Sequence, residues 1–268
     1  MTGALDAYAH GHDDSVLRAH GARTVADSAR YLVPHLATGA RILDVGCGPG
    51  SLTADIAAHA PGSIVTGIDA SADVVAAADA AHGDVAEFTT GDIHALDFPD
   101  GHFDVVHAHQ VLQHLERPVA ALEEMRRVTR PGGVVAVRDA DYGGMTWAPD
   151  FAGITEWMRV YQAMTAANGH DANAGRHLLG WVRAAGFVEL DTTASVWCYA
   201  DPVRRRWWSG IWADRILRSS YRNHALDRGL ATEHDLEAMA SDFLRWAEAD
   251  DGIFVVPHVE IVARRTGG

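Results

Sequence analysis

Lysine is absent from this chain of 268 residues, so its 22 basic residues are all arginine. They are outnumbered by 36 acidic residues, and the formal net charge is -14. A surface this acidic repels the phosphates of nucleic acids and of anionic membranes. We therefore expect neither a nucleic acid nor a membrane as a main partner.

Cysteine is scarce, and long apolar runs are missing. Cys47 and Cys198 are too few for a disulfide framework, which fits a reducing compartment. The polar, histidine-rich start of the chain does not have the pattern of a signal peptide. No apolar run approaches the roughly 20 residues that a membrane-spanning helix needs. These absences predict a cytoplasmic location.

The most informative stretch that is present reads ILDVGCGPG, at residues 42–50. Apolar residues lead into glycines at alternate positions, and a helical pattern follows from Leu52. This order predicts a buried strand, a tight turn and the N-terminus of a helix. Glycines let the backbone approach a ligand closely, and the first amides of a helix are donors suited to a carboxylate or phosphate.

Strand and helix patterns alternate around this stretch. Strands separated by helices indicate a doubly wound parallel sheet, with ligands at the carboxyl ends of its strands. The predicted strands are Arg41–Val45, Ser63–Ile68, Val85–Thr90, Phe103–Ala108 and Val134–Arg138, with helices at Leu52–His59, Asp73–Ala81 and Pro118–Thr129 between them.

The alternation stops after Asp139. Two runs with strand character, at 187–199 and 253–263, enclose a helical insert of two predicted helices at 201–249. A further helical pattern covers Arg23–His35 near the start of the chain. Tryptophan and methionine recur on one face of the insert, a pattern more typical of a packed core than of a ligand wall.

Three carboxylates occupy matched places at the ends of predicted strands. A carboxylate after the second strand, Asp69, can accept hydrogen bonds from both hydroxyls of a ribose. Asp92 lies one strand further out, where it could bind the amine of an adenine. Asp44 leads into the glycine turn and could receive an ammonium group. This set fits an adenosine with an amino-acid tail better than a dinucleotide.

These motifs resemble the class I S-adenosylmethionine-dependent methyltransferases, in style the ubiquinone/menaquinone C-methyltransferase-like group. The resemblance covers about residues 23–140 through LDVGCGPG, TGIDAS, TGDIHALDFPDGHFDVVHAHQVLQHL and VTRPGG. It implies an α/β fold with a doubly wound, mostly parallel seven-stranded sheet of the Rossmann-like type, an antiparallel last strand and helical lid insertions. The runs at 187–199 and 253–263 would then be an antiparallel pair.

The resemblance implies a single methyltransferase domain over residues 1–268. Its parts would be an N-terminal arm and helix at 1–36, a cofactor-binding core at 37–140, helical lid or substrate insertions at 141–175 and 201–249, and the C-terminal part of the sheet at 176–200 and 250–268.

The resemblance also implies roles in binding S-adenosylmethionine. Asp69, next to Ala70, would bind the ribose, and Asp92 would hold the adenine between Gly91 and Ile93. The other implied contacts are Gly46, Cys47, Gly48 and Gly50 around the methionine part with Asp44 at its ammonium group, His109 and Gln110 near the sulfonium, and Tyr8 and His12 closing over the cofactor from the arm.

A general base is needed only if the acceptor loses a proton. We propose His114, just past the fourth strand, because an unperturbed histidine titrates near neutrality. The alternative for His114 is a packing role at the start of a helix. His177 and Tyr142 are weaker candidates for the base.

Asp139 and Asp141 lie at the end of the fifth strand, and this pair of carboxylates suggests a magnesium site. Magnesium favours oxygen ligands in octahedral geometry, and the pair has no clear third ligand. We therefore expect no metal. Arg176 could grip an acidic group of the acceptor through its planar fork, or it could pair with a surface acid.

The predicted function is S-adenosylmethionine-dependent methyl transfer to a small, partly apolar acceptor by in-line displacement. One alternative is a nicotinamide-dependent oxidoreductase. The GxGxG spacing of this turn differs from the GxGxxG pattern of dinucleotide-binding proteins, and such an enzyme would have no obvious use for Asp92. Another is a module that binds S-adenosylmethionine without catalysis. The identity of the acceptor, the atom methylated and the oligomeric state stay open.

Overall fold

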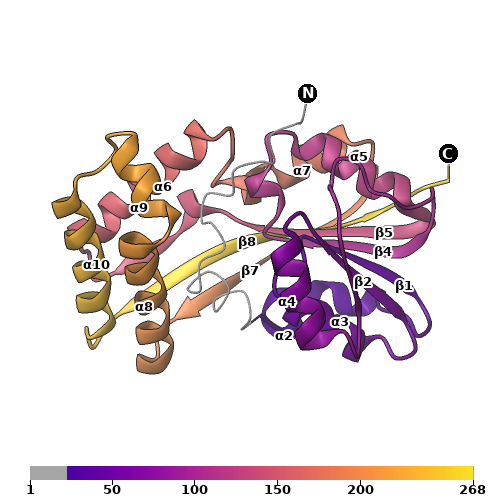
Figure 1. The fold of residues 1–268 in the computed structure, drawn as a ribbon, viewed down its shortest axis with the longest axis horizontal. Helices are drawn as coiled ribbons and strands as arrows, with labels where there is room; N and C mark the ends of the chain where they lie inside the picture. The colour runs from indigo at the N-terminus through magenta and orange to yellow at the C-terminus, as the bar shows by residue number, and fades with distance from the viewer. Residues whose placement is uncertain (1–22, 268) are drawn as a thin grey trace.

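An eight-stranded mixed sheet forms the centre of the computed structural model, which describes residues 23–267. The strand order is β3-β2-β1-β4-β5-β8-β6. β7 pairs with β8 along the edge that faces away from β5 and β6, and the two strands run side by side in Figure 1. The first five strands are parallel to one another, as expected: β1 (Arg41–Val45), β2 (Ile64–Asp69), β3 (Glu87–Thr90), β4 (Phe103–His109) and β5 (Thr129–Ala140).

Both faces of the parallel sheet are covered by the connecting helices. Neighbouring residues on one strand point to opposite faces, so Ile42 packs with α2, η1 and α3, whereas Leu43 packs with α5 and α7. The connecting elements are α2 (Val25–Ser28), the 3-10 helix η1 (Arg30–His35), α3 (Ser51–His59), α4 (Ala72–His82), the 3-10 helix η2 (Leu112–His114), α5 (Pro118–Val128) and α7 (Ala174–Ala184).

The two strands at the end of the chain form the expected antiparallel pair. β7 (Glu189–Tyr199) pairs over its whole length with β8 (Ile253–Arg264). The expectation of seven strands was wrong by one, because the short β6 (Thr146–Ala148) pairs with the start of β8. Three residues are too few to show the alternation that marks a strand.

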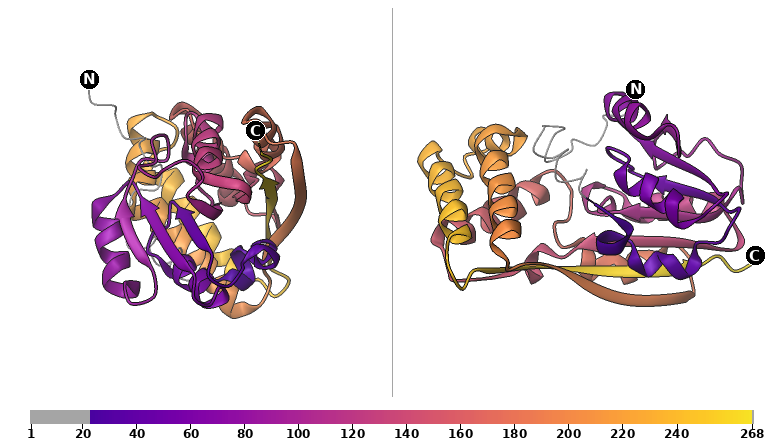
Figure 2. Two further views of the ribbon diagram at one scale, coloured as in Figure 1. Left: turned by 90° about the vertical axis from the view of Figure 1, so that its right-hand side faces the viewer. Right: turned by 90° about the horizontal axis from the view of Figure 1, so that it is seen from below.

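A group of helices lies beyond the sheet, at the C-terminal end of β7 and the N-terminal end of β8 (Figures 1 and 2). We call them the helical layer: α6 (Ala152–Ala167), α8 (Pro202–Arg218), α9 (Ser220–Asp227) and α10 (Glu233–Ala247). The ring centre of Trp157 on α6 lies 4.4 Å from the ring centre of Trp212 on α8 and 5.2 Å from that of Phe243 on α10. The aromatic stripes therefore form mainly a packed core that joins both insertions.

The insert at 201–249 contains three helices, where two were expected. Ser219 ends α8 in an extended conformation, and its hydroxyl then accepts a hydrogen bond from the backbone N–H of Tyr221 to begin α9. Thr232 caps the start of α10, since its hydroxyl accepts a hydrogen bond from the backbone N–H of Asp235 at 3.2 Å.

Three other boundaries differ from the prediction. The helix expected over Arg23–His35 is broken after Ser28, and its second half is a 3-10 helix that contains Pro34. β3 begins at Glu87. β5 already begins at Thr129, because Gly132 and Gly133 exchange backbone hydrogen bonds with Arg265. None of the helices within residues 23–267 combines the length and apolar character needed to cross a bilayer.

Candidate functional site

The glycine turn between β1 and α3 requires glycine. Gly46, Gly48 and Gly50 have φ angles of +69°, +54° and +81°, in the left-handed region that side chains disfavour. A Cβ atom on Gly46 would lie 2.4 Å from Val111, and one on Gly50 would lie 2.8 Å from Phe88. The turn is thus packed closely against its neighbours. The backbone N–H of Cys47 also ties it to β2 by donating to the carbonyl of Ile68 at 2.9 Å.

Asp44, just before the glycine turn, links the turn to the neighbouring elements. Its carboxylate is 2% exposed and accepts hydrogen bonds from Thr53 Oγ1 at 2.6 Å and from His107 Nδ1 at 2.7 Å. The side chain therefore links β1 to α3 and to β4. This bracing role was not anticipated, and a direct contact from Asp44 to an ammonium group stays a prediction.

Asp69 and Asp92 lie at the same edge of the sheet. Asp69 ends β2 directly opposite Thr90 of β3, and Asp92 follows two residues later. Asp69 accepts from the backbone N–H groups of Gly48 and Ser71, both at 3.1 Å, which joins it to the glycine turn. Asp92 accepts from the N–H of His94 at 2.8 Å, and 62% of its side chain is exposed.

The residues beside these two aspartates follow the same edge. Ala70 is exposed just after β2, and Ile93 is half-buried just after β3. The N–H of Gly91 donates to the carbonyl of Asp69 at 3.0 Å. The glycine turn, Asp69 and Asp92 thus form one continuous rim along this edge of the sheet, and their contacts with a cofactor stay predictions.

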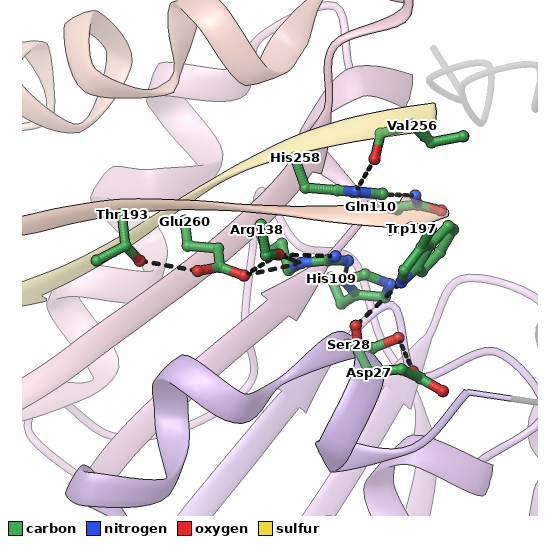
Figure 3. Close-up of polar contacts among 11 residues, drawn as sticks. Asp27, Ser28, His109, Gln110, Arg138, Thr193, Trp197, Val256, His258 and Glu260 are labelled. Atoms are coloured by element: carbon green, nitrogen blue, oxygen red, sulfur yellow. Dashed lines mark hydrogen bonds and ion pairs between the residues drawn. The ribbon is translucent and has the colours of Figure 1, made fainter. Parts of the chain in front are cut away.

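His109 and Gln110 stand at the end of β4, within a network of polar side chains (Figure 3). Gln110 has a φ of +55°, which is uncommon for a residue with a side chain. Its Nε2 donates to His258 Nε2 at 2.9 Å, while His258 Nδ1 bonds the Val256 carbonyl at 3.1 Å. His109 is buried, and burial together with nearby arginines such as Arg23 holds its pKa well below 6.5. Burial likewise holds the pKa of His258 well below 6.5. Both histidines are therefore neutral.

A cavity of about 300 Å³ lies next to this network, between the ends of β4 and β5 and the helical layer. Its walls combine polar groups from the sheet edge with aromatic rings from β7 and α8. The main lining residues are Gln110, Gln113, His114, Tyr142, Trp197, Tyr199, Trp207, Trp208 and Trp212, joined by Arg23, Arg204 and Arg215. A cavity of this size, apolar with a few polar groups, is typical of a small-molecule site.

His114 lines this cavity, as its predicted role requires. Burial and the neighbouring His170, whose ring centre is 6.3 Å away, lower the pKa of His114 to about 3. The expectation that this histidine titrates near neutrality was therefore wrong. The imidazole is neutral over the physiological range, and its use as a base stays a prediction.

Asp139 and Asp141, the pair considered for magnesium, each make contacts within the protein, and the absence of a metal stays a prediction. Asp139 is fully buried, accepts from the N–H of Gln113 at 3.4 Å, and has a pKa raised by burial to about 8. Asp141 instead accepts two hydrogen bonds from Arg176, at 2.8 Å and 2.6 Å, so Arg176 pairs with an acid on the protein. Within residues 23–267, no three His, Cys, Asp or Glu side chains are grouped to hold a metal ion.

Of the weaker candidates for the base, Tyr142 lines the cavity, whereas His177 lies 3.5 Å from Asp171 and does not. Tyr8 and His12 lie outside the described residues. The arginines and tryptophans of the cavity wall were missed as site residues. Arg23 sits at the start of the described residues, and Trp197 lies in β7. The tryptophans of α8 belong to an apolar stripe that looked more typical of a packed core than of a ligand wall.

Comparisons with known proteins agree on one family. Residues 43–137 match the family model described as a methyltransferase domain. An uncharacterised methyltransferase of Schizosaccharomyces pombe is 35% identical over 274 residues, covering 96% of each chain. The 2-methyl-6-phytyl-1,4-hydroquinone methyltransferase of Synechocystis is 33% identical over 71% of this chain and 59% of its own length. The solved phosphoethanolamine N-methyltransferase 2 of Haemonchus contortus, in complex with S-adenosyl-L-methionine, has a TM-score of 0.58 at 16% identity, covering 99% of this chain and 61% of its own.

Proposed function

Because the chain belongs to the class I S-adenosylmethionine-dependent methyltransferases, we propose that it methylates a small, partly apolar molecule bound in the aromatic cavity. The observation that carries this proposal is the position of the cavity, which opens where β4 and β5 end, beside Gln110 and His114. Membership of this family argues against the alternative of a nicotinamide-dependent oxidoreductase. The hydroquinone-methylating relative from Synechocystis gives one example of a partly apolar acceptor.

The proposed cofactor site is the rim formed by the glycine turn, Asp69 and Asp92. Two features of this rim support the fit. The turn keeps three glycines in left-handed conformations that no other residue adopts easily, and Asp69 holds both of its oxygens against that turn and the start of α4. Asp69 retains lone pairs for the hydroxyls of a ribose, and the exposed Asp92 can accept from an adenine amine.

S-adenosylmethionine supplies a methyl group on a positively charged sulfur. The protein's own task is to align the acceptor and to exclude water, which is worth about 7–11 kcal/mol of the barrier. The rings of α8 and β7 would hold the apolar body of the acceptor. His114, whose pKa is about 3, would accept a hydrogen bond from the acceptor and is poorly suited to keep a proton.

Calorimetry and a methyl-transfer assay test this proposal together. We expect S-adenosylmethionine and S-adenosylhomocysteine to bind and NAD not to bind. We further expect radiolabelled methyl groups to move onto at least one member of a broad panel of aromatic acceptors. Binding without any transfer would favour a non-catalytic module, and failure of both sulfur nucleosides to bind would refute the proposed site.

A further inference from the structure

Among residues 23–267, the charged side chains that line the cavity are mostly of the sign opposite to the net charge of the chain. The protein has a formal net charge of -14. The cavity nevertheless brings together three arginines, Arg23, Arg204 and Arg215, and its wall within the described residues contains a single carboxylate, that of Asp27. His114 adds no charge, because its pKa is about 3. A basic cavity within an acidic protein attracts and concentrates anions.

The carboxylate of Asp27 is engaged by the start of α2. One of its oxygens accepts from the backbone N–H of Thr24 at 3.1 Å, and the other accepts from the Thr24 hydroxyl at 3.0 Å. The hydroxyl of Ser28 also donates to it, at 2.5 Å. Asp27 thus caps the short helix α2, and both of its oxygens accept hydrogen bonds from residues at the start of that helix.

Each arginine of the cavity lies over the face of an aromatic ring. The guanidinium carbon of Arg23 is 5.7 Å from the centre of Trp197, that of Arg204 is 5.2 Å from Tyr199, and that of Arg215 is 5.1 Å from Trp212. Tyr199 in turn stacks on Trp208 at 4.4 Å. The cavity lining therefore combines cationic groups with aromatic faces, which suits a flat apolar ligand with a negative group.

Arg204 is the arginine best placed to receive such a ligand. It lies in the first turn of α8, is exposed, and forms no ion pair with any acid in residues 23–267. Arg206, two residues later on the same helix, pairs instead with Glu248 at 2.9 Å. The two side chains share an element and a chemistry, but only Arg204 lines the cavity.

We propose that the acceptor is an aromatic oxyanion, a carboxylate or phosphate carried on a flat apolar body, with its anionic group at the guanidinium of Arg204. This inference rests on the proposed function. An anionic acceptor also balances the charges of the site, since it would lie between the arginines and a positively charged sulfonium. The planar fork of arginine can bind either oxyanion through two hydrogen bonds.

The test compares matched ligands by calorimetry on the full-length protein saturated with S-adenosylhomocysteine. The probes are naphthoate, naphthyl phosphate and the uncharged naphthamide. We expect one of the two anions to bind at least tenfold more tightly than naphthamide. Arg204→Gln should lower the affinity for that anion about tenfold, as expected for the loss of hydrogen bonds to a charged group. Arg206→Gln serves as the matched control and should leave the affinity unchanged.

The outcomes separate this inference from the function on which it rests. If S-adenosylhomocysteine does not bind the unmodified protein, the proposed function fails. If it binds, the inference alone is overturned by equal affinity for naphthamide and both anions, by no binding of any probe, or by an Arg204→Gln variant that keeps the preference for the anion. Whichever anion binds more tightly identifies carboxylate or phosphate as the oxyanion.

Discussion

Single glycines in the β1–α3 turn allow its backbone to pack closely against neighbouring side chains at the candidate cofactor site. Gly50 combines a φ of +81° with a neighbour, the ring of Phe88, that would lie 2.8 Å from any Cβ atom. Gly39 has a similar φ of +75° but open space around it, with nothing within 4 Å of where a methyl carbon would stand. The two positions separate the effect of backbone strain from the effect of packing.

Gly50→Ala should lower the free energy of unfolding by clearly more than Gly39→Ala. Both substitutions introduce a left-handed alanine, at about 1–2 kcal/mol. Only Gly50→Ala also overpacks the contact with Phe88, which adds about 1–3 kcal/mol. Urea unfolding of the two variants measures the difference. Equal losses would mean that the Phe88 ring moves aside without cost and that the turn is not closely packed.

At the scale of elements, the junction of β5, β7 and β8 is held by a buried ion pair. Arg138 of β5 donates from Nε to Glu260 of β8 at 3.1 Å, and both side chains are buried. From β7, Thr193 donates to the same carboxylate at 2.8 Å (Figure 3), and Ser195 also donates to it, at 2.5 Å. The guanidinium of Arg138 also lies 5.1 Å from the ring of Trp197, which lines the cavity.

Removal of the carboxylate by Glu260→Ala should destabilise the protein by about 3–5 kcal/mol, because it leaves the Arg138 charge buried without compensation. Chemical denaturation measures this loss. The exposed pair of Arg206 and Glu248 provides the control, and Glu248→Ala should leave the stability nearly unchanged, because water screens an exposed ion pair. A small effect of Glu260→Ala would show that water reaches Arg138 and that this junction is not a closed polar core.

Sequence patterns reveal the elements of this chain better than they reveal its site. The five parallel strands were predictable because apolar runs and glycine turns are local signals, whereas the antiparallel pairing of the last two strands followed from the family resemblance. The three-residue β6 and the break after Ser28 were not, since tertiary pairing decides them. The glycine turn, Asp69 and Asp92 could be found from spacing, whereas the approach of Arg204 and Trp197 to Gln110 depends on how the insertions pack.

At the scale of the whole molecule, buried ionisable groups link stability to pH. Burial holds the pKa values of His109 and His258 well below 6.5 and that of His114 at about 3. As the pH falls below 6.5, these histidines would take up protons in the unfolded chain but not in the folded one. Asp139 acts in the opposite sense, because its pKa of about 8 lets the folded chain keep a proton that the unfolded chain loses above about pH 4.

The free energy of unfolding should therefore fall as the pH drops from about 6.5 towards about 4.5, since three histidines outweigh one aspartate. Each histidine contributes at most about 1.4 kcal/mol per pH unit. Urea titrations at several pH values measure the slope, and His258→Gln should reduce it. A stability that rises over this range, or a slope unchanged in His258→Gln, would show that these imidazoles are protonated in the folded protein.

The central claim is that the sheet edge holds the nucleoside and the neighbouring cavity holds the acceptor. A crystal structure with S-adenosylhomocysteine bound tests it most directly. We predict ribose hydroxyls within hydrogen-bond distance of the Asp69 carboxylate, the adenine amine at Asp92, and the sulfur facing the cavity at Gln110. A nucleoside bound elsewhere, or a sulfur directed away from the cavity, would contradict the account.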